Sequence, residues 1–175
     1  YLAIDMRRIG GYELGMLPTT GPDSEGYVTT MWGIKREEQA DGKGKPRIIS
    51  PFGDDVTIED VHKHPWPNVN SLDFSGVFEL CNKYHDKYAV YGSPWCPFFH
   101  EVGYLFGQEN FFVFMYTKPE VLEAATEHVV AFELEATQRF LQAARGKIDI
   151  VYFGNDFGTQ RSLAISPEMW NKFIR

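Results

Sequence analysis

The polar side chains of one short loop, Gly154 to Gln160, are the best candidates in this sequence for a functional site. The loop offers two amides, a carboxyl group and a hydroxyl. A carboxyl group whose pKa is raised by partial burial can give a proton to a leaving oxygen atom, which makes Asp156 the candidate catalytic acid. The candidate substrate-binding residues are Asn155, Thr159 and Gln160. The alternative is that the loop is only a solvated connector.

The sequence on either side of this loop predicts a strand and a helix. Ile148 to Phe153 is a short apolar run rich in β-branched and aromatic residues, which favours a strand buried on both faces. Ser166 and Pro167 are typical of a helix start, with a capping hydroxyl and a proline at the first helical position. Ligands of α/β proteins bind at the carboxyl ends of parallel strands, so the loop lies where a site is expected.

A second strand followed by a loop occurs earlier in the chain. Tyr88 to Gly92 predicts a short buried strand, and Ser93 and Trp95 come directly after it as further candidate substrate-binding residues. Arg7 is a candidate for binding an anionic group of the substrate. A solvated arginine at the end of an element is the alternative for Arg7.

The remaining elements are predicted as scaffold. Pro119 to Arg145 is the longest helix, ended by Gly146. Its buried stripe is predicted to comprise Leu122, Ala125, Val129, Phe132, Ala136, Phe140 and Ala144. Residues 27–52 are rich in β-formers around a glycine-rich turn and predict a β-hairpin outside the repeated βα units.

Composition restricts the partners of this chain. With 175 residues and 43% hydrophobic content, we expect one globular domain with a true core. The net charge of −7 without a basic cluster argues against nucleic acid or an anionic membrane surface as a partner, leaving small molecules or proteins. The two cysteines provide no disulfide framework, and no signal peptide or membrane-spanning run is present. We therefore expect a soluble, cytoplasmic protein.

No metal site is predicted within the chain. Cys96 and His100 lie one helical turn apart with Glu101 adjacent, and His62 and His64 alternate in a polar segment. Neither set has the third ligand that catalytic zinc usually needs. A surface position is therefore the interpretation favoured for His62 and His64.

The two ends of the chain predict that it is part of a larger protein. Tyr1 to Ile4 is apolar and lacks an initiator methionine, and Arg175 comes about two turns after the start of the last predicted helix. The apolar face of that helix, Met169, Trp170 and Phe173, would lack a partner. We expect exposed sheet edges and self-association, including homo-oligomers.

Several segments together resemble the uroporphyrinogen decarboxylase superfamily. The most specific is FGNDFGTQRSLAISPEMWNKFI at 153–174, supported by YGSPWCPFF at 91–99, GQENFFVFMYTKPEVL at 107–122 and MWGI at 31–34. The resemblance implies a (β/α)8 TIM barrel. Such a barrel needs about 250 residues, so residues 1–175 would form a partial barrel domain and the other strands would lie outside the chain.

The resemblance implies one of two enzyme chemistries. One is methyl transfer to or from a corrinoid protein or a thiol, including demethylation of methoxylated aromatics, with a zinc ion in some members. The other is cofactor-free decarboxylation of uroporphyrinogen in porphyrin biosynthesis. The stretch from Met6 to Tyr12 is superficially similar to the arginine motif MRQAGRY of these decarboxylases, but Gly11 replaces its second arginine, and the distance to the GSPW stretch fits better a later, LGIDFRRV-like segment of the family. Asp156 would repel an octa-anionic porphyrinogen, which favours methyl transfer. A non-catalytic scaffold or binding module is the third reading.

Overall fold

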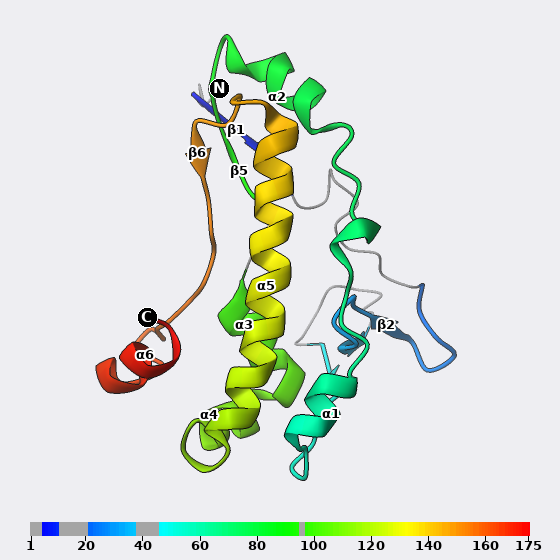
Figure 1. Ribbon diagram of the computed structural model, residues 1–175, viewed down its shortest axis with the longest axis vertical. Helices are drawn as coiled ribbons and strands as arrows, with labels where there is room; N and C mark the ends of the chain where they lie inside the picture. Colours follow the sequence, from blue (N-terminus) through cyan, green and yellow to red (C-terminus); the bar gives the residue numbers. More distant parts are fainter. Residues whose placement is uncertain (1–4, 11–20, 38–45, 95–96) are drawn as a thin grey trace. The chain divides into compact units, whose positions relative to one another are not determined.

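The computed structural model describes residues 5–10, 21–37, 46–94 and 97–175 (Figure 1). These residues form a mixed α/β structure with one parallel and one antiparallel sheet. They group into two compact units, each built from separate stretches of chain. The first unit comprises Tyr1–Pro18, Pro67–Pro97 and Val130–Gly154, and the second comprises Thr19–Trp66, Phe98–Val129 and Asn155–Arg175.

The first unit contains a small parallel sheet. Its strands are β1 (Met6–Ile9), β5 (Ala89–Gly92) and β6 (Ile150–Val151), in the order β1-β5-β6. β5 is central, and Val90 within it is fully buried, which confirms the buried strand predicted there. The described parallel strands form an open sheet of three strands.

The strand before the candidate loop differs from its prediction. β6 is shorter than the apolar run and lies at the edge of the sheet, where Ile150 is 47% and Val151 39% exposed. Tyr152 and Phe153 are also exposed. The prediction of burial on both faces was therefore wrong, because an edge strand has a neighbour on one side only.

Two glycines allow close backbone contact at the carboxyl end of this sheet. A Cβ atom on Gly92 would lie 1.7 Å from the carbonyl oxygen of Ile9, its partner in β1. Gly10 has φ +127°, and a Cβ atom there would lie 2.2 Å from the carbonyl oxygen of Ser93. At Gly10, only glycine tolerates both the positive φ and the short distance to the carbonyl oxygen of Ser93. At Gly92, only glycine leaves room for the carbonyl oxygen of Ile9. The ends of β1 and β5 therefore meet through their backbones.

The helices of the first unit follow the apolar pattern of the sequence. α2 (Val77–His85) buries Val77 and Cys81, and the short 3-10 helix η2 (Val69–Ser71) precedes it. The longest helix, α5 (Pro119–Ala144), runs through parts of both units. Every residue of its predicted stripe is buried, which confirms that prediction.

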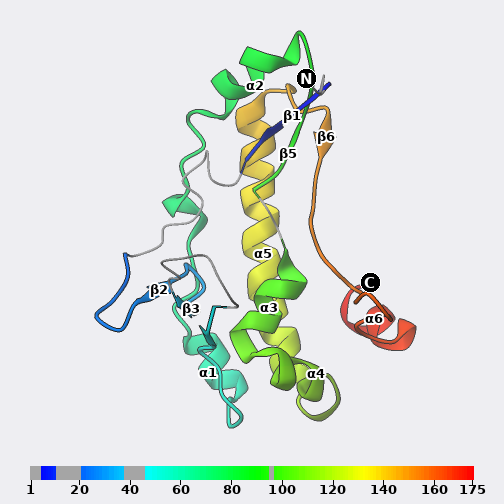
Figure 2. The same ribbon diagram turned by 180° about the vertical axis from the view of Figure 1, so that it is seen from behind.

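The antiparallel sheet belongs to the second unit (Figure 2). It contains β2 (Tyr27–Thr29), β3 (Lys35–Glu37) and β4 (Ile48–Ile49) in that order. The predicted hairpin at 27–52 thus includes an extra strand, because a tight turn at Thr30–Ile34 already reverses the chain between β2 and β3.

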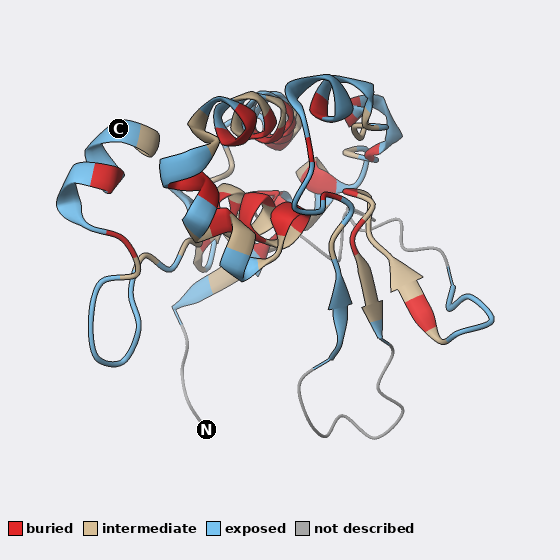
Figure 3. Ribbon diagram, turned by 90° about the horizontal axis from the view of Figure 1, so that it is seen from below, coloured by how far each residue is buried: buried red, intermediate tan, exposed pale blue. Residues whose placement is uncertain are grey.

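Four helices complete the second unit. They are α1 (Ile58–Lys63), α3 (Phe98–Phe106), α4 (Gln108–Thr117) and α6 (Pro167–Phe173). Ser166 caps α6 by accepting the N–H of Met169, with Pro167 at the first position, as the sequence predicts. α3 and α4 contribute the buried residues Phe99, Phe106, Phe111 and Phe114. Figure 3 colours the ribbon red at buried residues. Among the described residues, no helix is both long and apolar enough to cross a membrane.

Candidate functional site

The candidate loop is anchored to the first turn of α3 by Asn155. The side-chain oxygen Oδ1 of Asn155 accepts the backbone N–H of Phe99 at 3.0 Å. The first N–H groups of a helix have no partner within the helix, so an external acceptor is stabilising there. Asn155 therefore acts as a cap contributed from a distant part of the sequence.

Asp156 lies beside His100 of the same helix. Its backbone N–H donates to Nε2 of His100 at 3.0 Å, and its Oδ2 lies 3.9 Å from the same nitrogen. Nε2 can accept this N–H only while it carries no proton of its own. The Asp156 side chain is 90% exposed, so the predicted partial burial of this carboxyl group was wrong. The reason is that Phe157, not Asp156, turns toward the apolar residues of α3.

Phe157 holds the loop by aromatic contact. Its ring centre lies 5.0 Å from that of Phe99 and 6.5 Å from that of Phe98, at the start of α3. It also lies 6.4 Å from the ring of Trp170 in α6. Such tilted and edge-on ring pairs stabilise beyond the area they bury. The loop therefore has one polar and one aromatic anchor on α3.

The hydroxyl of Thr159 is used within the loop itself. Oγ1 accepts the N–H groups of Arg161 and Ser162 at 3.2 and 3.1 Å and donates to the carbonyl oxygen of Ser162 at 3.1 Å. This is a side-chain turn that closes the segment before α6. Gln160 is exposed. Thr159 thus has a structural role in the described structure.

The other predicted site residues belong to the first unit. The hydroxyl of buried Ser93 donates to the carbonyl oxygen of Tyr152, which joins the ends of β5 and β6. Arg7 lies in β1 with its guanidinium carbon 3.7 Å from the ring centre of Tyr88. Trp95 lies outside the described residues. Ser93 and Arg7 therefore both contact their own sheet and its immediate flank.

Two ionisable residues of the second unit, Glu101 on α3 and Arg36, were not predicted as substrate-site residues, although Glu101 was considered beside Cys96 and His100 as part of a metal site. Burial raises the pKa of Glu101 from 4.5 to about 7, although the positive charge of Arg36 opposes that rise. Arg36, from β3, lies with its guanidinium carbon 4.9 Å from the ring centre of Tyr104 on α3. The sequence did contain one indication of a buried acid, because Glu101 lies within the apolar run FFHEVGYLF. The sequence could not show that Arg36 lies near Tyr104, because that contact depends on tertiary structure.

Three histidines of the second unit, His62, His64 and His128, gather around Trp66. The ring of His128 stacks on Trp66 with centres 4.6 Å apart, and the ring of His62 lies 5.8 Å from His128. His64, predicted at the surface, is half-buried, and its Nε2 lies 3.0 Å from the carbonyl oxygen of Trp32. Across the described ranges, no group of three or more metal-binding side chains comes together. Cys96 lies outside those ranges.

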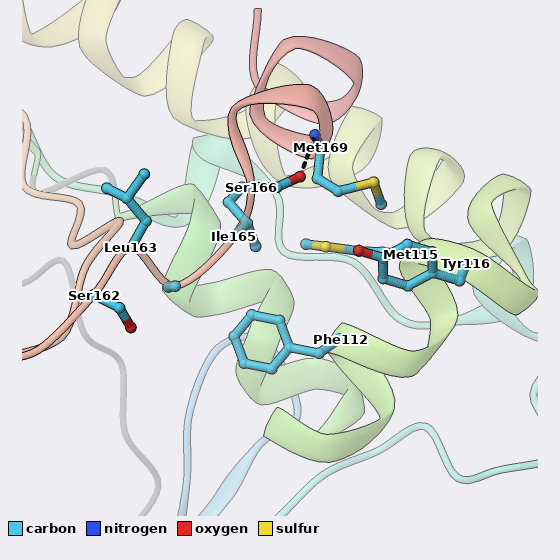
Figure 4. A pocket seen from close by; sticks show the side chains of 9 residues that line it. Phe112, Met115, Tyr116, Ser162, Leu163, Ile165, Ser166 and Met169 are labelled. Atoms are coloured by element: carbon cyan, nitrogen blue, oxygen red, sulfur yellow. Dashed lines mark hydrogen bonds between the residues drawn. The ribbon is translucent and has the colours of Figure 1, made fainter.

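A mainly apolar pocket of about 490 Å³ lies between α4 and the segment that leads into α6 (Figure 4). Met115 and Met169 face each other across it, and Phe112 and Tyr116 form its α4 side. Ser162 and Ser166, from the segment after the loop, also line the pocket. The pocket suits an apolar group, and Asn155, Asp156, Thr159 and Gln160 are not among its lining residues.

Comparison of the whole chain with family models, with curated proteins and with solved structures gives no match.

Proposed function

We propose that this protein is a methyltransferase of the uroporphyrinogen decarboxylase type, with the loop from Gly154 to Gln160 contributing to the substrate site. The proposal includes the (β/α)8 barrel that the sequence resemblance implies. The open parallel sheet, with helices between its strands, is compatible with part of such a barrel.

One observation carries the proposal. Two segments that produce the family resemblance, far apart in the sequence, meet at the start of α3. Asn155 contacts Phe99, and Asp156 contacts His100. Residues brought together at the end of a strand and the start of a helix are typical of α/β substrate sites.

In this proposal the exposed carboxyl group of Asp156 orients the methyl donor, and the oxygen that leaves when the methyl ether is cleaved takes its proton from solvent. The methyl group passes as a cation equivalent to the nucleophilic cobalt of a reduced corrinoid protein, or to a thiolate. The ether oxygen keeps the bonding electron pair and takes up the proton, so charge and atoms balance. Nε2 of His100 lies 3.9 Å from Oδ2 of Asp156, where it can help to hold the carboxylate in position.

The proposal is tested by assaying the purified protein with a methoxylated phenol and a reduced corrinoid protein, and separately with uroporphyrinogen. Asp156→Asn should lower methyl transfer by roughly 10²-fold, the scale on which a small misplacement of the substrate lowers the rate. The melting temperature should change little, because the side chain is exposed. Asp55→Asn, an exposed aspartate in the same unit, is the control.

Two outcomes would overturn the assignment. Decarboxylation of uroporphyrinogen without methyl transfer would make the protein a decarboxylase. Methyl transfer that survives Asp156→Asn at a nearly normal rate would remove Asp156 from catalysis while leaving the reaction class in place.

A further inference from the structure

The pocket between α4 and the segment that leads into α6 has a buried floor and an exposed rim (Figure 4). Met115 and Met169, which face each other across it, are both buried, and so is Ile165. Tyr116 and Leu163 line the same pocket but are 72% and 63% exposed. The pocket therefore leaves large apolar side chains in contact with water at its mouth, where a bound ligand would cover them.

The size of the pocket suits a small molecule better than a protein partner. Its volume of about 490 Å³ lies within the range of small-molecule sites and is roughly three times that of a cavity of about 150 Å³ that holds one benzene ring. A ligand of about two or three fused rings therefore fits. Nine residues line the pocket, whereas a stable protein interface involves about 20–30 residues on each side.

The lining residues determine which kind of small molecule fits. Among the nine described residues that line the pocket, none carries a charge, so an ionised ligand would find no oppositely charged partner there. The thioethers of Met115 and Met169 are polarisable and make favourable contacts with aromatic rings. On the α4 side, Phe112 and Tyr116 offer rings for stacked or edge-on contact. An uncharged aromatic ligand therefore matches both sides of the pocket.

We propose that this pocket is a binding site for an uncharged aromatic molecule of about two or three fused rings, held between Met115 and Met169. The site lies within the second unit and is separate from the residues assigned above to methyl transfer. Binding there requires no reaction, so this proposal does not rest on the proposed function.

A fluorescence titration measures the binding. N-phenylnaphthylamine is uncharged, and its emission rises in an apolar environment, so it reports occupancy of the pocket. Naphthamide and naphthoate then compete with this probe; they share the same ring system, but naphthoate carries a negative charge. Naphthamide should displace the probe at a concentration at least about 10-fold lower than naphthoate, because the pocket has no partner for the charge. Equal displacement by the two ligands would overturn the proposal.

Methionine methyl groups locate the ligand within the chain. In NMR spectra of protein labelled at these methyl groups, naphthamide should shift the signals of Met115 and Met169. Met6 of β1 and Met31 do not line the pocket, so their signals should stay unchanged and are internal controls. Shifts at Met6 or Met31 without shifts at Met115 and Met169 would place the ligand elsewhere and overturn the proposal.

Substitutions test the space and the chemistry of the pocket separately. Ala164→Phe places a ring at the pocket wall and should weaken naphthamide binding at least about 10-fold. Ala131→Phe, at an exposed position of α5, is the control and should leave binding unchanged. Replacing both Met115 and Met169 by leucine keeps their volume but removes the sulfur atoms, so binding should weaken by about 3-fold or more.

Circular dichroism shows whether each variant is folded, and the leucine variant provides the test if Ala164→Phe does not fold. Binding that survives both changes would overturn the proposal. Sedimentation of the unaltered chain gives the remaining outcome. A dimer that excludes naphthamide and is disrupted by Ala164→Phe would show that a second copy of the chain, and not a small molecule, occupies the pocket.

Discussion

Oδ1 of Asn155 accepts a hydrogen bond from the backbone nitrogen of Phe99 at 3.0 Å. The bond joins the loop after β6 to the first turn of α3, although Asn155 and Phe99 lie far apart in the sequence. It fixes the backbone on which Asp156 is presented to His100. A substitution of Asn155 should therefore change both the free energy of unfolding and the position of Asp156.

Asn155→Ala should lower the free energy of unfolding by about 1 kcal/mol, because the N–H of Phe99 loses its acceptor. Asn155→Asp keeps an acceptor and places a negative charge near the start of a helix, so it should retain most of the stability. Urea denaturation measures both effects, with the exposed Asn171→Ala as the control. Equal stability of Asn155→Ala and the unaltered protein would show that water replaces the amide without loss.

The histidine cluster predicts lower stability in acid. Burial lowers the pKa of His128 in the folded state, with a further contribution from His62, and burial also lowers the pKa of His64. The unfolded chain therefore binds more protons as the pH falls below about 6.5, which favours unfolding. Because these rings are only partly buried, we expect a loss of roughly 0.5 to 1 kcal/mol between pH 7.5 and 5.5.

His128→Phe tests this interpretation because a phenylalanine ring can still stack on Trp66. The variant should lose less stability than the unaltered protein over the same pH range. Urea denaturation at both pH values gives the comparison. If His128→Phe loses as much stability between pH 7.5 and 5.5 as the unaltered protein does, His128 is not a source of the acid sensitivity.

Glu101 predicts the opposite pH dependence. Burial raises the pKa of Glu101 from 4.5 to about 7, so the folded state binds its proton more tightly than the unfolded chain. The stabilisation is complete below pH 4.5 and is lost as the pH rises through 7. Glu101→Gln cannot ionise and should escape this loss.

The variant should therefore be more stable than the unaltered protein at pH 8, by roughly 1 to 3 kcal/mol, and about equal to it near pH 4.5. Thermal denaturation of both proteins across this range measures the difference. If the difference in stability between the two proteins is the same at every pH, Glu101 does not change its protonation state across this range and the prediction is wrong.

Local patterns in the sequence predicted the scaffold well. The apolar stripe of α5 and the cap at Ser166 depend on residues a few positions apart, so the sequence contains nearly all the information that determines them. The central position of β5 also agreed with its uninterrupted apolar run. These features arise from helix periodicity, capping chemistry and strand composition.

The errors arose where distant segments determine the environment. The run before the candidate loop has the composition of a buried strand, but its position at the edge of the sheet leaves Ile150 exposed. The environment of Asp156 was also mistaken, since Phe157 and not Asp156 packs on Phe99. The burial of Glu101 was not predicted at all. Composition near a residue cannot show which distant side chain will cover it.

The glycine contacts between β1 and β5 also affect how this sequence can diverge. At Gly92 the obstacle to a side chain is the backbone of Ile9, and at Gly10 it is the backbone of Ser93. Substituting the neighbouring side chains cannot make room, because every amino acid contributes the same carbonyl oxygen. Related proteins that keep this sheet should therefore retain both glycines even where the surrounding residues have changed completely, whereas the exposed positions of β6 are free to vary.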